Sequence, residues 1–288
     1  MYDICCIGHI TSDKVVNARA VMYMPGGTAL YFSCAMSKLN MSYLLVTSLA
    51  PAEMDYVASL ENQGIPIITY PSANTVNFEN IYAEDQDQRT QNVLQKADPF
   101  SIEQFKNVDA NVFHLGPLLA DDIPVDLIRY LAGKGTISLD VQGYLRKVED
   151  KKVYPTDWPG KKEALPFVDI LKADVAELNA LTGCQDVHQG VRILNDWGVK
   201  EIVITNGSMG SLIYRDNQFY DIPAYAPPVI LDATGCGDTY MAGYLYQRNK
   251  GAGIQQRGEF AAAMAGLKTA SAGPFAGTEE DVNRFLLK

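Results

Sequence analysis

Short apolar runs alternate with helical patterns along most of the chain, and this alternation restricts the possible folds more than any other feature. Expected strands, rich in β-branched residues, are 4–7, 43–46, 112–115, 137–139, 170–171 and 202–204. Expected helices are 28–39, 54–63, 125–132, 175–181 and 187–197, several of which end near a glycine. This order predicts parallel β-α-β units, and therefore an α/β fold with a central sheet covered by helices on both faces.

Two segments in the first third of the chain do not fit this alternation. Residues 14–24 follow the first expected strand without a helix, and residues 75–89 are extended, polar and aromatic. We expect them to pair as a small β lid, at about 13–25 and 75–90. No Pro- or Gly-rich linker marks a boundary, so we expect one domain over 1–288 into which the lid is inserted.

Composition argues against several classes of partner. The net charge of −10 leaves no excess of Lys and Arg for a phosphate backbone or an anionic membrane, so we expect no nucleic-acid partner and no membrane. No leader peptide and no apolar stretch of about 20 residues is recognisable, which predicts a cytoplasmic protein. The five cysteines lack paired spacing and are expected to be reduced. His9, His114 and His188 are expected to be packing or surface residues.

The densest signal is the stretch 232–238, Asp-Ala-Thr-Gly-Cys-Gly-Asp, which precedes a helical pattern. Gly235 and Gly237 allow the backbone to approach a ligand, and the unpaired N–H groups of a first helical turn can bind a transferring phosphoryl group. Asp238 would then accept the proton of an attacking hydroxyl. Alternatively, Asp238 only caps a helix after an ordinary glycine loop. We expect Cys236, whose backbone belongs to this anion hole, to fill space rather than act as a nucleophile.

This stretch resembles the DTTGAGD signature of the PfkB or ribokinase-like carbohydrate kinases. Further landmarks of that family follow in the expected order over nearly the whole chain. The resemblance implies ATP-dependent phosphorylation of a hydroxyl group by a three-layer α/β/α sandwich with a mainly parallel central sheet and a small β lid. A GxxxxGK[ST] loop and a GxGxxG after the first strand are both missing, so another scaffold would hold ATP.

The resemblance also implies a set of substrate-binding residues. In IGHITSD, Asp13 matches a carboxylate that grips substrate hydroxyls, and in PGGTALYF two glycines would let the substrate lie against the backbone. Tyr31 stands where many sugar kinases have Asn. The implied set is Asp13, Gly26, Gly27, Tyr31, Asn77, Arg89 and Asp140. There are plainer alternatives: Asp13 lies in a turn, Gly26 and Gly27 form a helix entry, Tyr31 is a core aromatic and Asp140 ends a strand.

Metal and nucleotide sites are implied in the same way. Glu177 in LKADVAELN resembles the glutamate of the family's NxxE motif, with Asp174 in the place of Asn, and the pair would hold Mg²⁺ through water. A capping box at a helix start is the alternative. The implied nucleotide-binding residues are Thr205, Asn206, Gly207, Gly210, Thr234, Ala263 and Gly273. Alternatively, residues 205–210 form a plain hairpin turn, and Ala263 only allows close helix packing. Family members also often place K⁺ beside the anion hole.

Tyr31, Gln142 and the lid segment resemble the inositol-kinase branch more than ribokinase or fructokinase. We therefore expect the acceptor to be myo-inositol, a similar polyol or a sugar, phosphorylated by ATP with Mg²⁺, with K⁺ as a further candidate ion. One alternative is a nucleoside kinase, with Phe78 and Tyr82 stacking on a base. A non-catalytic sensor of the same fold is another. We expect either a monomer or a homodimer paired through the lid.

Overall fold

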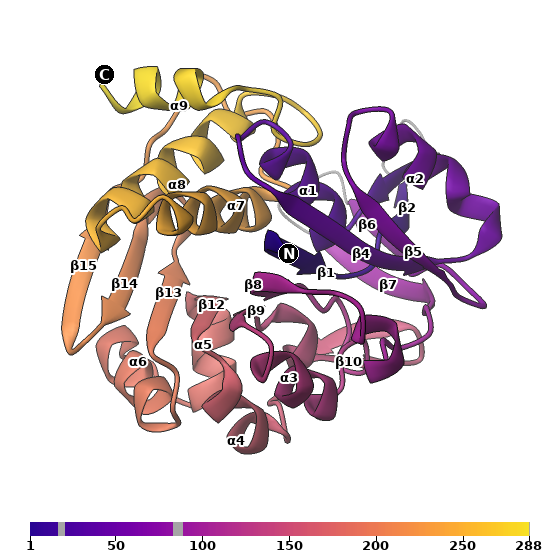
Figure 1. Cartoon of the computed structure of the whole chain (residues 1–288), viewed down its shortest axis with the longest axis horizontal. Coiled ribbons are helices and arrows are strands. Elements are labelled where there is room, and N and C mark those ends of the chain that lie inside the picture. The colour runs from indigo at the N-terminus through magenta and orange to yellow at the C-terminus, as the bar shows by residue number, and fades with distance from the viewer. Residues whose placement is uncertain (17–20, 83–88, 288) are drawn as a thin grey trace.

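The computed structural model describes residues 1–16, 21–82 and 89–287, and these form two sheets and the helices that cover them (Figure 1). The order of the larger sheet is β15 (Gln218–Ile222), β14 (Ser211–Arg215), β13 (Glu201–Thr205), β12 (Ile170–Asp174), β9 (Thr136–Asp140), β8 (Ala110–Leu115), β1 (Tyr2–Ile7), β4 (Tyr43–Leu49) and β5 (Ile67–Pro71). Pairing is parallel from β5 to β13 and antiparallel for β14 and β15. The predicted mainly parallel sheet is confirmed.

Helices cover both faces of this sheet (Figure 1). One face carries α1 (Thr28–Met36), α2 (Met54–Glu61), α7 (Cys236–Asn249), α8 (Ile254–Thr269) and α9 (Glu279–Leu286). The other carries α3 (Val125–Ala132), α4 (Lys161–Ala164), α5 (Val175–Thr182) and α6 (Val187–Asp196). Short 3₁₀ turns occur at η1 (Pro51–Glu53), η2 (Ile102–Phe105), η3 (Gln142–Leu145), η4 (Leu165–Phe167) and η5 (Gly207–Met209). The predicted three-layer α/β/α sandwich is therefore confirmed.

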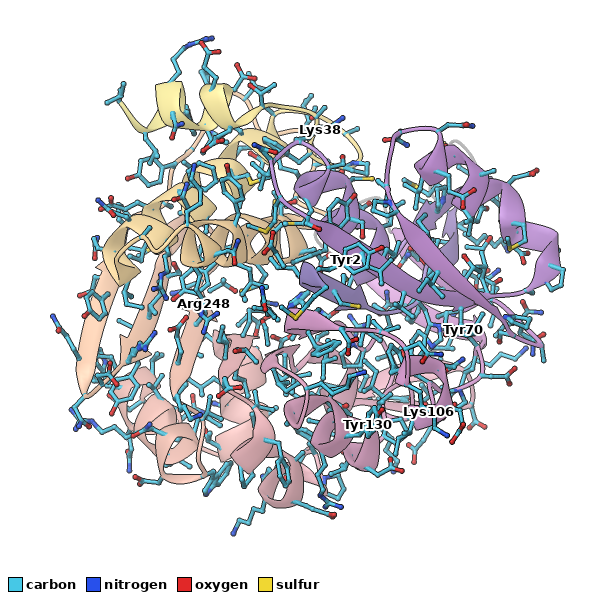
Figure 2. The ribbon with its side chains drawn as sticks, viewed as in Figure 1. Tyr2, Lys38, Tyr70, Lys106, Tyr130 and Arg248 are labelled. Carbon is cyan, nitrogen blue, oxygen red and sulfur yellow. The ribbon has the colours of Figure 1, made fainter. Side chains whose placement is uncertain are left out.

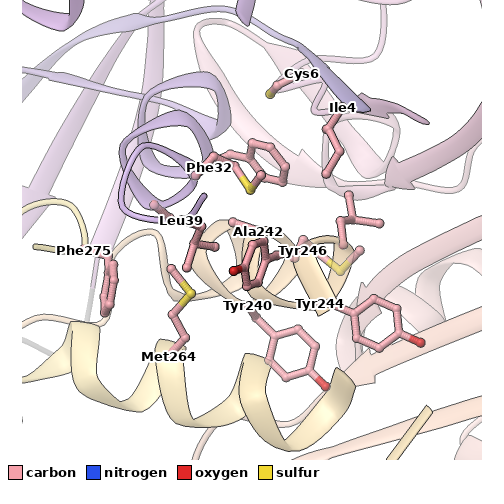
Figure 3. Packing of buried hydrophobic residues seen from close by; sticks show 14 of the residues in the cluster. Ile4, Cys6, Phe32, Leu39, Tyr240, Ala242, Tyr244, Tyr246, Met264 and Phe275 are labelled. Atoms are coloured by element: carbon pink, nitrogen blue, oxygen red, sulfur yellow. The ribbon is translucent and has the colours of Figure 1, made fainter. Parts of the chain in front are cut away.

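Strand β1 shows why the sheet is buried on both faces. Ile4 and Cys6 point into the core beneath α1, α7 and α8, whereas the alternate residues Cys5 and Ile7 point into the core beneath α3 and α5. Figure 3 shows the first of these cores, in which Ile4 and Cys6 lie on the strand side of Phe32. Each large apolar side chain buried in this way stabilises the fold by about 1.5–3 kcal/mol.

The predicted β lid is present as a second sheet. Its order is β10 (Arg146–Glu149), β11 (Lys152–Pro155), β7 (Arg89–Gln95), β6 (Asn77–Tyr82), β2 (Thr11–Val16) and β3 (Val21–Gly26). The parts of the expected lid at 17–20 and 83–88 lie outside the described residues. The hairpin of β10 and β11 was not predicted. Strand β3 forms one edge of this sheet and exposes apolar side chains of 21–24, so pairing of two lids stays a prediction.

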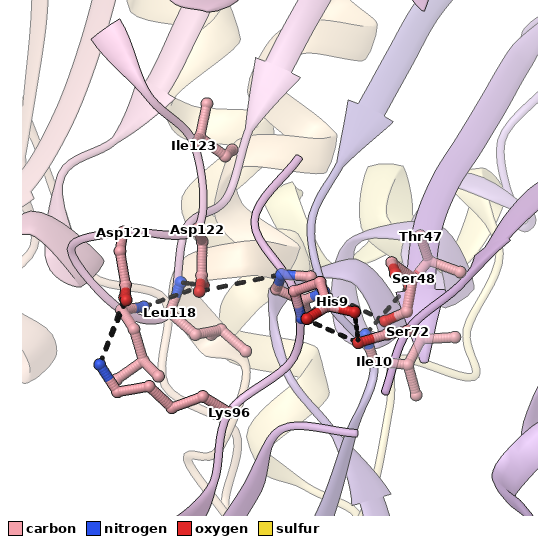
Figure 4. Close-up of polar contacts among 12 residues, drawn as sticks. His9, Ile10, Thr47, Ser48, Ser72, Lys96, Leu118, Asp121, Asp122 and Ile123 are labelled. Atoms are coloured by element: carbon pink, nitrogen blue, oxygen red, sulfur yellow. Dashed lines mark hydrogen bonds and ion pairs between the residues drawn. The ribbon is translucent and has the colours of Figure 1, made fainter. Parts of the chain in front are cut away.

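A buried polar cluster joins the loop that follows β1, the end of β4 and the loop that follows β8 (Figure 4). The Nδ1 atom of His9 lies 3.0 Å from the carbonyl oxygen of Ser48, and its Nε2 atom lies 3.8 Å from Oδ1 of Asp122. The other carboxylate oxygen of Asp122 accepts hydrogen bonds from the N–H groups of Leu118 and Leu119. Burial raises the pKa of Asp122, and the nearby His9 opposes this rise. The cluster fixes the edge of the sheet at which these strands end.

The other two histidines are a packing residue and a surface residue, as predicted, and each lies beside an aromatic ring. His114 is buried, and its ring stacks on Phe32 with 4.4 Å between centroids. His188 is exposed beside Phe219.

Charged side chains cover the outer surface, with Lys38 and Lys106 exposed on opposite sides of the sheet (Figure 2). In the described part of the chain, none of the helices is long and apolar enough to cross a bilayer.

Candidate active site

The glycine-rich stretch forms a turn that leads directly into α7. Gly235 is the N-cap residue and has φ of 74°, in the left-handed region that glycine adopts without strain. The helix begins at Cys236, which places Asp238 in its first turn rather than before it. In the described part of the chain, the N–H groups of Gly237 and Asp238 have no hydrogen-bond partner. Free donors at a helix N-terminus are what the predicted anion hole requires, and binding of an anion there stays a prediction. We call residues 232–238 the anion-hole turn.

The Asp238 carboxylate lies among other charged groups and accepts a hydrogen bond from the Thr28 side chain at the start of α1. Its pKa is raised to about 6, first by burial and then by the Asp140 carboxylate. Lys172 and Arg146 oppose this rise. A carboxylate with a pKa near neutrality is a more effective proton acceptor than an ordinary aspartate, and it is still mostly ionised at pH 7.

Lys172, in the middle of β12, was missed by the sequence analysis. Its Nζ atom lies 2.9 Å from Oδ2 of Asp140 and 3.8 Å from Oε2 of Glu177. A Cβ built on Gly237 would lie 3.2 Å from the same Nζ atom, so the ammonium reaches the anion hole. Burial lowers the pKa of Lys172, but Asp140, Glu177 and Asp238 outweigh burial and raise it. The side chain is therefore a permanent cation beside the N-terminus of α7.

Arg146, at the start of β10, supplies a second cation that was not among the predicted site residues. Its guanidinium lies over the Phe78 ring, 5.8 Å from the centroid, and donates to the carbonyl oxygen of Leu118 at 3.3 Å. Its charge also lowers the pKa of Asp238. The 3₁₀ turn η3 separates Arg146 from the end of β9 at Asp140 and carries the arginine onto the second sheet.

The predicted acceptor-binding residues Asp13, Gly26, Gly27 and Tyr31 lie where β2, β3 and α1 meet. A Cβ on Gly26 would lie 2.6 Å from Oδ2 of Asp13, so glycine leaves room for the carboxylate. Gly27 has φ of 89° and is the N-cap residue of α1. Tyr31 is buried, and its ring packs directly against Gly235. Tyr31 is therefore a buried core aromatic, which is the alternative to a substrate contact, and its ring also contacts the turn that leads into α7.

Asn77 begins β6, at the point where the register with β7 shifts between Asn77 and Phe78, and its Oδ1 atom is buried with no hydrogen-bond partner among the described residues. Its role in acceptor binding stays a prediction. Lys14 of β2 is paired with Glu79 of β6 in both register and charge. Because side chains alternate along strands, Asp13 faces the side opposite to Lys14 and Glu79. Asn80, which pairs with Val15, lies on the Asp13 face. The side chain of Arg89 lies outside the described residues.

The predicted metal-binding pair forms a capping box at the start of α5. The N–H of Glu177 donates to Oδ1 of Asp174 at 2.7 Å, and the N–H of Asp174 donates to Oε2 of Glu177 at 2.7 Å. No group of three or more His, Cys, Asp or Glu side chains that could hold a metal occurs among residues 1–16, 21–82 and 89–287. The pair does place one carboxylate beside Lys172, and this arrangement suits a hydrated Mg²⁺ held mainly by a phosphoryl donor.

Some of the predicted nucleotide-binding residues lie in exposed turns, and one lies in a buried helix. Residues 205–210 connect β13 to β14 in an antiparallel hairpin, and 206–209 are exposed. Thr234 is exposed, and the N–H of Gly273 donates to Oδ2 of Asp232 at 3.2 Å, so both lie at the anion-hole turn. Ala263 is completely buried within the helix core and presents no surface to a ligand.

Cys236 has the environment expected of a packed thiol. Its Sγ atom lies 3.7 Å from the carbonyl oxygen of Ala265. Burial raises the pKa of the Cys236 thiol to about 11, with Lys268 opposing the shift. The thiol is therefore protonated at neutral pH. The N–H of Cys236 donates to the carbonyl oxygen of Ala233 at 3.2 Å, so it is not among the free donors of the first turn of α7.

Replacing Gly235 with Ala is expected to destabilise the fold by about 1–3 kcal/mol, because alanine is strained at positive φ and its Cβ would enter the Tyr31 ring. Gly251→Ala is a matched control: Gly251 has φ of 77°, and no atom lies within 4 Å of the position that a Cβ would take. Thermal unfolding of both variants separates the backbone strain from the contact with Tyr31. Equal losses of stability would contradict a close contact between Gly235 and Tyr31.

Comparison with known proteins agrees with this geometry. Residues 1–281 match the family model of the pfkB family carbohydrate kinases. A cytidine kinase of Thermococcus kodakarensis is 30% identical over 268 residues, covering 89% of this chain and 92% of the relative. A nucleoside kinase of Methanothermobacter thermautotrophicus is 25% identical over 288 residues, covering 91% of this chain and 88% of the relative.

Solved structures give the same result. A pyrophosphate-dependent kinase in the ribokinase family, complexed with a pyrophosphate analog and myo-inositol, is 28% identical with a TM-score of 0.88, covering 98% of this chain and 99% of that chain. Arabidopsis thaliana ribokinase, complexed with ribose and ATP, shares the fold at 20% identity with a TM-score of 0.83, covering 99% of this chain and 98% of that chain. The protein is therefore a member of the pfkB family of carbohydrate kinases, which transfer a phosphoryl group to a hydroxyl acceptor.

Proposed function

We propose that the protein transfers the terminal phosphoryl group of ATP to a hydroxyl of a small polyol or sugar, with myo-inositol as the favoured type of acceptor. The observation that carries this proposal is the position of the Asp238 carboxylate, whose pKa of about 6 suits a base, in the first turn of α7. The proposal assigns two polar groups of the second sheet, Asp13 of β2 and Arg146 of β10, to the acceptor side of that carboxylate, and the charge of Arg146 acts on Asp238.

In the proposed reaction, the acceptor hydroxyl gives its proton to a carboxylate oxygen of Asp238 as its own oxygen forms a bond to the γ-phosphorus. The bond from that phosphorus to the bridging oxygen breaks, and its electron pair leaves with ADP. The N–H groups of Gly237 and Asp238 and the Lys172 ammonium stabilise the charge on the transferring group. Asp13 and Asp140 accept hydrogen bonds from other acceptor hydroxyls and hold the reacting hydroxyl in line.

Mg²⁺ fits this arrangement as an ion held by the donor phosphates and, through water, by Glu177. Glu177 uses Oε2 for the capping box and for Lys172. When bound, the ion would neutralise phosphate charge. Asp174 and Glu177 are thus proposed to combine a structural role with a role in metal binding.

A second candidate donor is inorganic pyrophosphate. The relative that uses pyrophosphate is 28% identical over nearly the whole chain. Lys172 and the anion hole would hold the transferred phosphate in either case, and the predicted adenine-side residue Ala263 is enclosed. With either donor, the proposed acceptor and base are the same.

A nucleoside is the second candidate acceptor, supported by the 30% identity to the Thermococcus cytidine kinase. The predicted stacking residue Phe78 is only 3% exposed, and the guanidinium of Arg146 lies over its ring. The side chain of Tyr82 lies outside the described residues. The occupied face of Phe78 favours a polyol or sugar over a base that needs an open aromatic surface.

The test is a panel of cyclic polyols, sugars and nucleosides, each assayed with ATP and with pyrophosphate in the presence of Mg²⁺. We expect one or a few polyols or sugars to yield a phosphomonoester, detected by ³¹P NMR, at a rate at least tenfold above any nucleoside. A nucleoside as the best acceptor would replace the proposed acceptor class. No phosphorylated product with any pair would favour the non-catalytic sensor.

A further inference from the structure

Lys268, near the end of α8, is buried and lies outside the reacting groups of the active site. The residue is 1% exposed, and its side chain ranks among the largest that are fully buried. A buried ammonium is costly unless its charge and its hydrogen-bond donors are satisfied. Lys268 lies on a helix that packs against α7, since α7 and α8 lie side by side (Figure 1). Its burial therefore needs partners near α7.

The ammonium of Lys268 binds one residue at two points. It donates to the carbonyl oxygen of Asp232 at 2.8 Å and to the Oδ2 atom of the same residue at 2.9 Å. The Tyr31 ring centroid lies 5.9 Å from Nζ, within the range of a cation–π contact. Because both the main chain and the side chain of Asp232 are held, this residue cannot rotate without breaking a partly buried ion pair.

Asp232 in turn holds the backbone of the anion-hole turn by hydrogen bonds. Its Oδ1 atom accepts a hydrogen bond from the N–H of Thr234 at 2.8 Å, and its Oδ2 atom accepts a second one from Gly273 at 3.2 Å. Thr234 is followed at once by Gly235, the left-handed N-cap residue of α7. The path from the ammonium to the first turn that carries Asp238 is therefore continuous and hydrogen-bonded.

The ligands gathered around Nζ are a carbonyl oxygen, a carboxylate oxygen and an aromatic face, all of which attract a monovalent cation. We propose that Lys268 is a positioning residue whose tethered ammonium serves as a built-in cation for the anion-hole turn, so that turnover needs no added monovalent cation. This inference rests on the proposed kinase function. It replaces the expectation of a K⁺ ion at this turn by a side chain of the protein itself.

Lys268→Ala and Lys268→Met separate charge from volume. Both remove the ammonium, but Ala leaves a space into which a small cation can enter, whereas Met fills that space. We expect both variants to lose about 10–100-fold in kcat with less than a threefold change in KM for the acceptor. Methylammonium or K⁺ at up to 100 mM should raise the kcat of the Ala variant at least fivefold and the kcat of the Met variant less than twofold.

Two controls complete the experiment. In the wild type, replacing K⁺ by tetramethylammonium should change kcat by less than twofold. Lys250→Ala removes a half-exposed lysine that binds Glu279 near the far end of α7, and it should keep wild-type activity and cation independence. Circular dichroism and thermal unfolding establish that each variant is folded before rates are compared.

Several results would overturn the inference. They are a wild type activated more than fivefold by K⁺, an Ala variant with normal kcat, and a folded Ala variant that no small cation rescues. If neither variant folds, the comparison of wild-type kcat in K⁺ and in tetramethylammonium tests the inference alone. If the wild type phosphorylates no acceptor, the kinase proposal has failed, and tetramethylammonium sulfate, whose cation is too large for the Ala space, is used as an anion probe. The inference then requires sulfate to raise the unfolding temperature of the wild type and, only with methylammonium present, that of Lys268→Ala.

Discussion

Asp238→Asn is expected to lower kcat by about 10²–10⁴-fold, because an amide cannot take the proton of the attacking hydroxyl. Donor binding should change little, since the N–H groups of the first turn of α7 and the Lys172 ammonium remain in place. Initial rates and calorimetric binding of a non-hydrolysable donor analogue measure the two effects separately. A variant that retains more than a tenth of wild-type kcat would remove Asp238 from the role of base.

The same substitution is expected to stabilise the fold at neutral pH. The pKa of Asp238 is raised from 3.8 to about 6 in the folded protein, so the folded state binds this proton more tightly than the unfolded state. The ionised group therefore lowers the free energy of unfolding progressively as the pH rises from about 4 to about 6. Asn carries no charge at any of these pH values. We expect Asp238→Asn to gain about 1–3 kcal/mol at pH 7 and to lose that advantage near pH 4, as measured by chemical denaturation.

Lys172→Met is expected to cause the second large change. Its ammonium is the partner of Asp140 at 2.9 Å and of Glu177 at 3.8 Å, so the variant removes the cation that pairs with both of these buried carboxylates. We expect a loss of about 3–5 kcal/mol in the free energy of unfolding at pH 7. Because Lys172 lowers the pKa of Asp238, its removal should also move the acid limb of the pH–rate profile to higher pH.

Lys134→Met is the matched control for Lys172→Met. Lys134 is partly buried, lies 3.0 Å from Asp109 and donates to the carbonyl oxygen of Phe105 at 3.0 Å, away from the residues of the site. Its replacement should leave kcat and the acid limb unchanged. If Lys172→Met keeps the wild-type stability and the wild-type acid limb, Lys172 neither stabilises the buried carboxylates nor tunes Asp238.

Asp238 could be predicted from the sequence because its signal is local: a glycine turn, a helix start and a carboxylate follow one another within 232–238. Lys172 could not, because a lysine between Leu171 and Ala173 in a strand is identified as functional only when Asp140 lies on the neighbouring strand. The pairing of β9 with β12 brings the two charges together. Such a contact depends on the order of strands, which no short motif specifies.

Which lid residues share a face with Asp13 depends on sheet register in the same way. The composition and position of residues 75–89 predicted a lid strand correctly, but the pairing of β2 with β6 decides which alternate residues face Asp13. The hairpin of β10 and β11 was missed for a different reason. Its turn uses Asp150 and Lys151 at φ of 48° and 68° instead of the Asn-Gly or Asp-Gly pairs that usually mark such turns.

The parallel sheet, by contrast, was predictable because its strands are short apolar runs separated by helical patterns. Strand boundaries differ by a few residues from the expected ones, since residues at the ends of β4 and β12 are polar but still pair in the sheet. The lid could be predicted as a pair of segments but not as the whole second sheet.

The most direct test of Asp238 as the base is the pH dependence of kcat/KM for the best acceptor, measured for the wild type and for Asp238→Asn. We predict a single acid limb with an apparent pKa near 6 in the wild type, from the ionisation of Asp238, and its absence from the residual activity of the variant. Any limb caused by ionisation of the donor would persist in both proteins. A flat wild-type profile between pH 5 and pH 8, or the same limb in both proteins, would contradict Asp238 as the base.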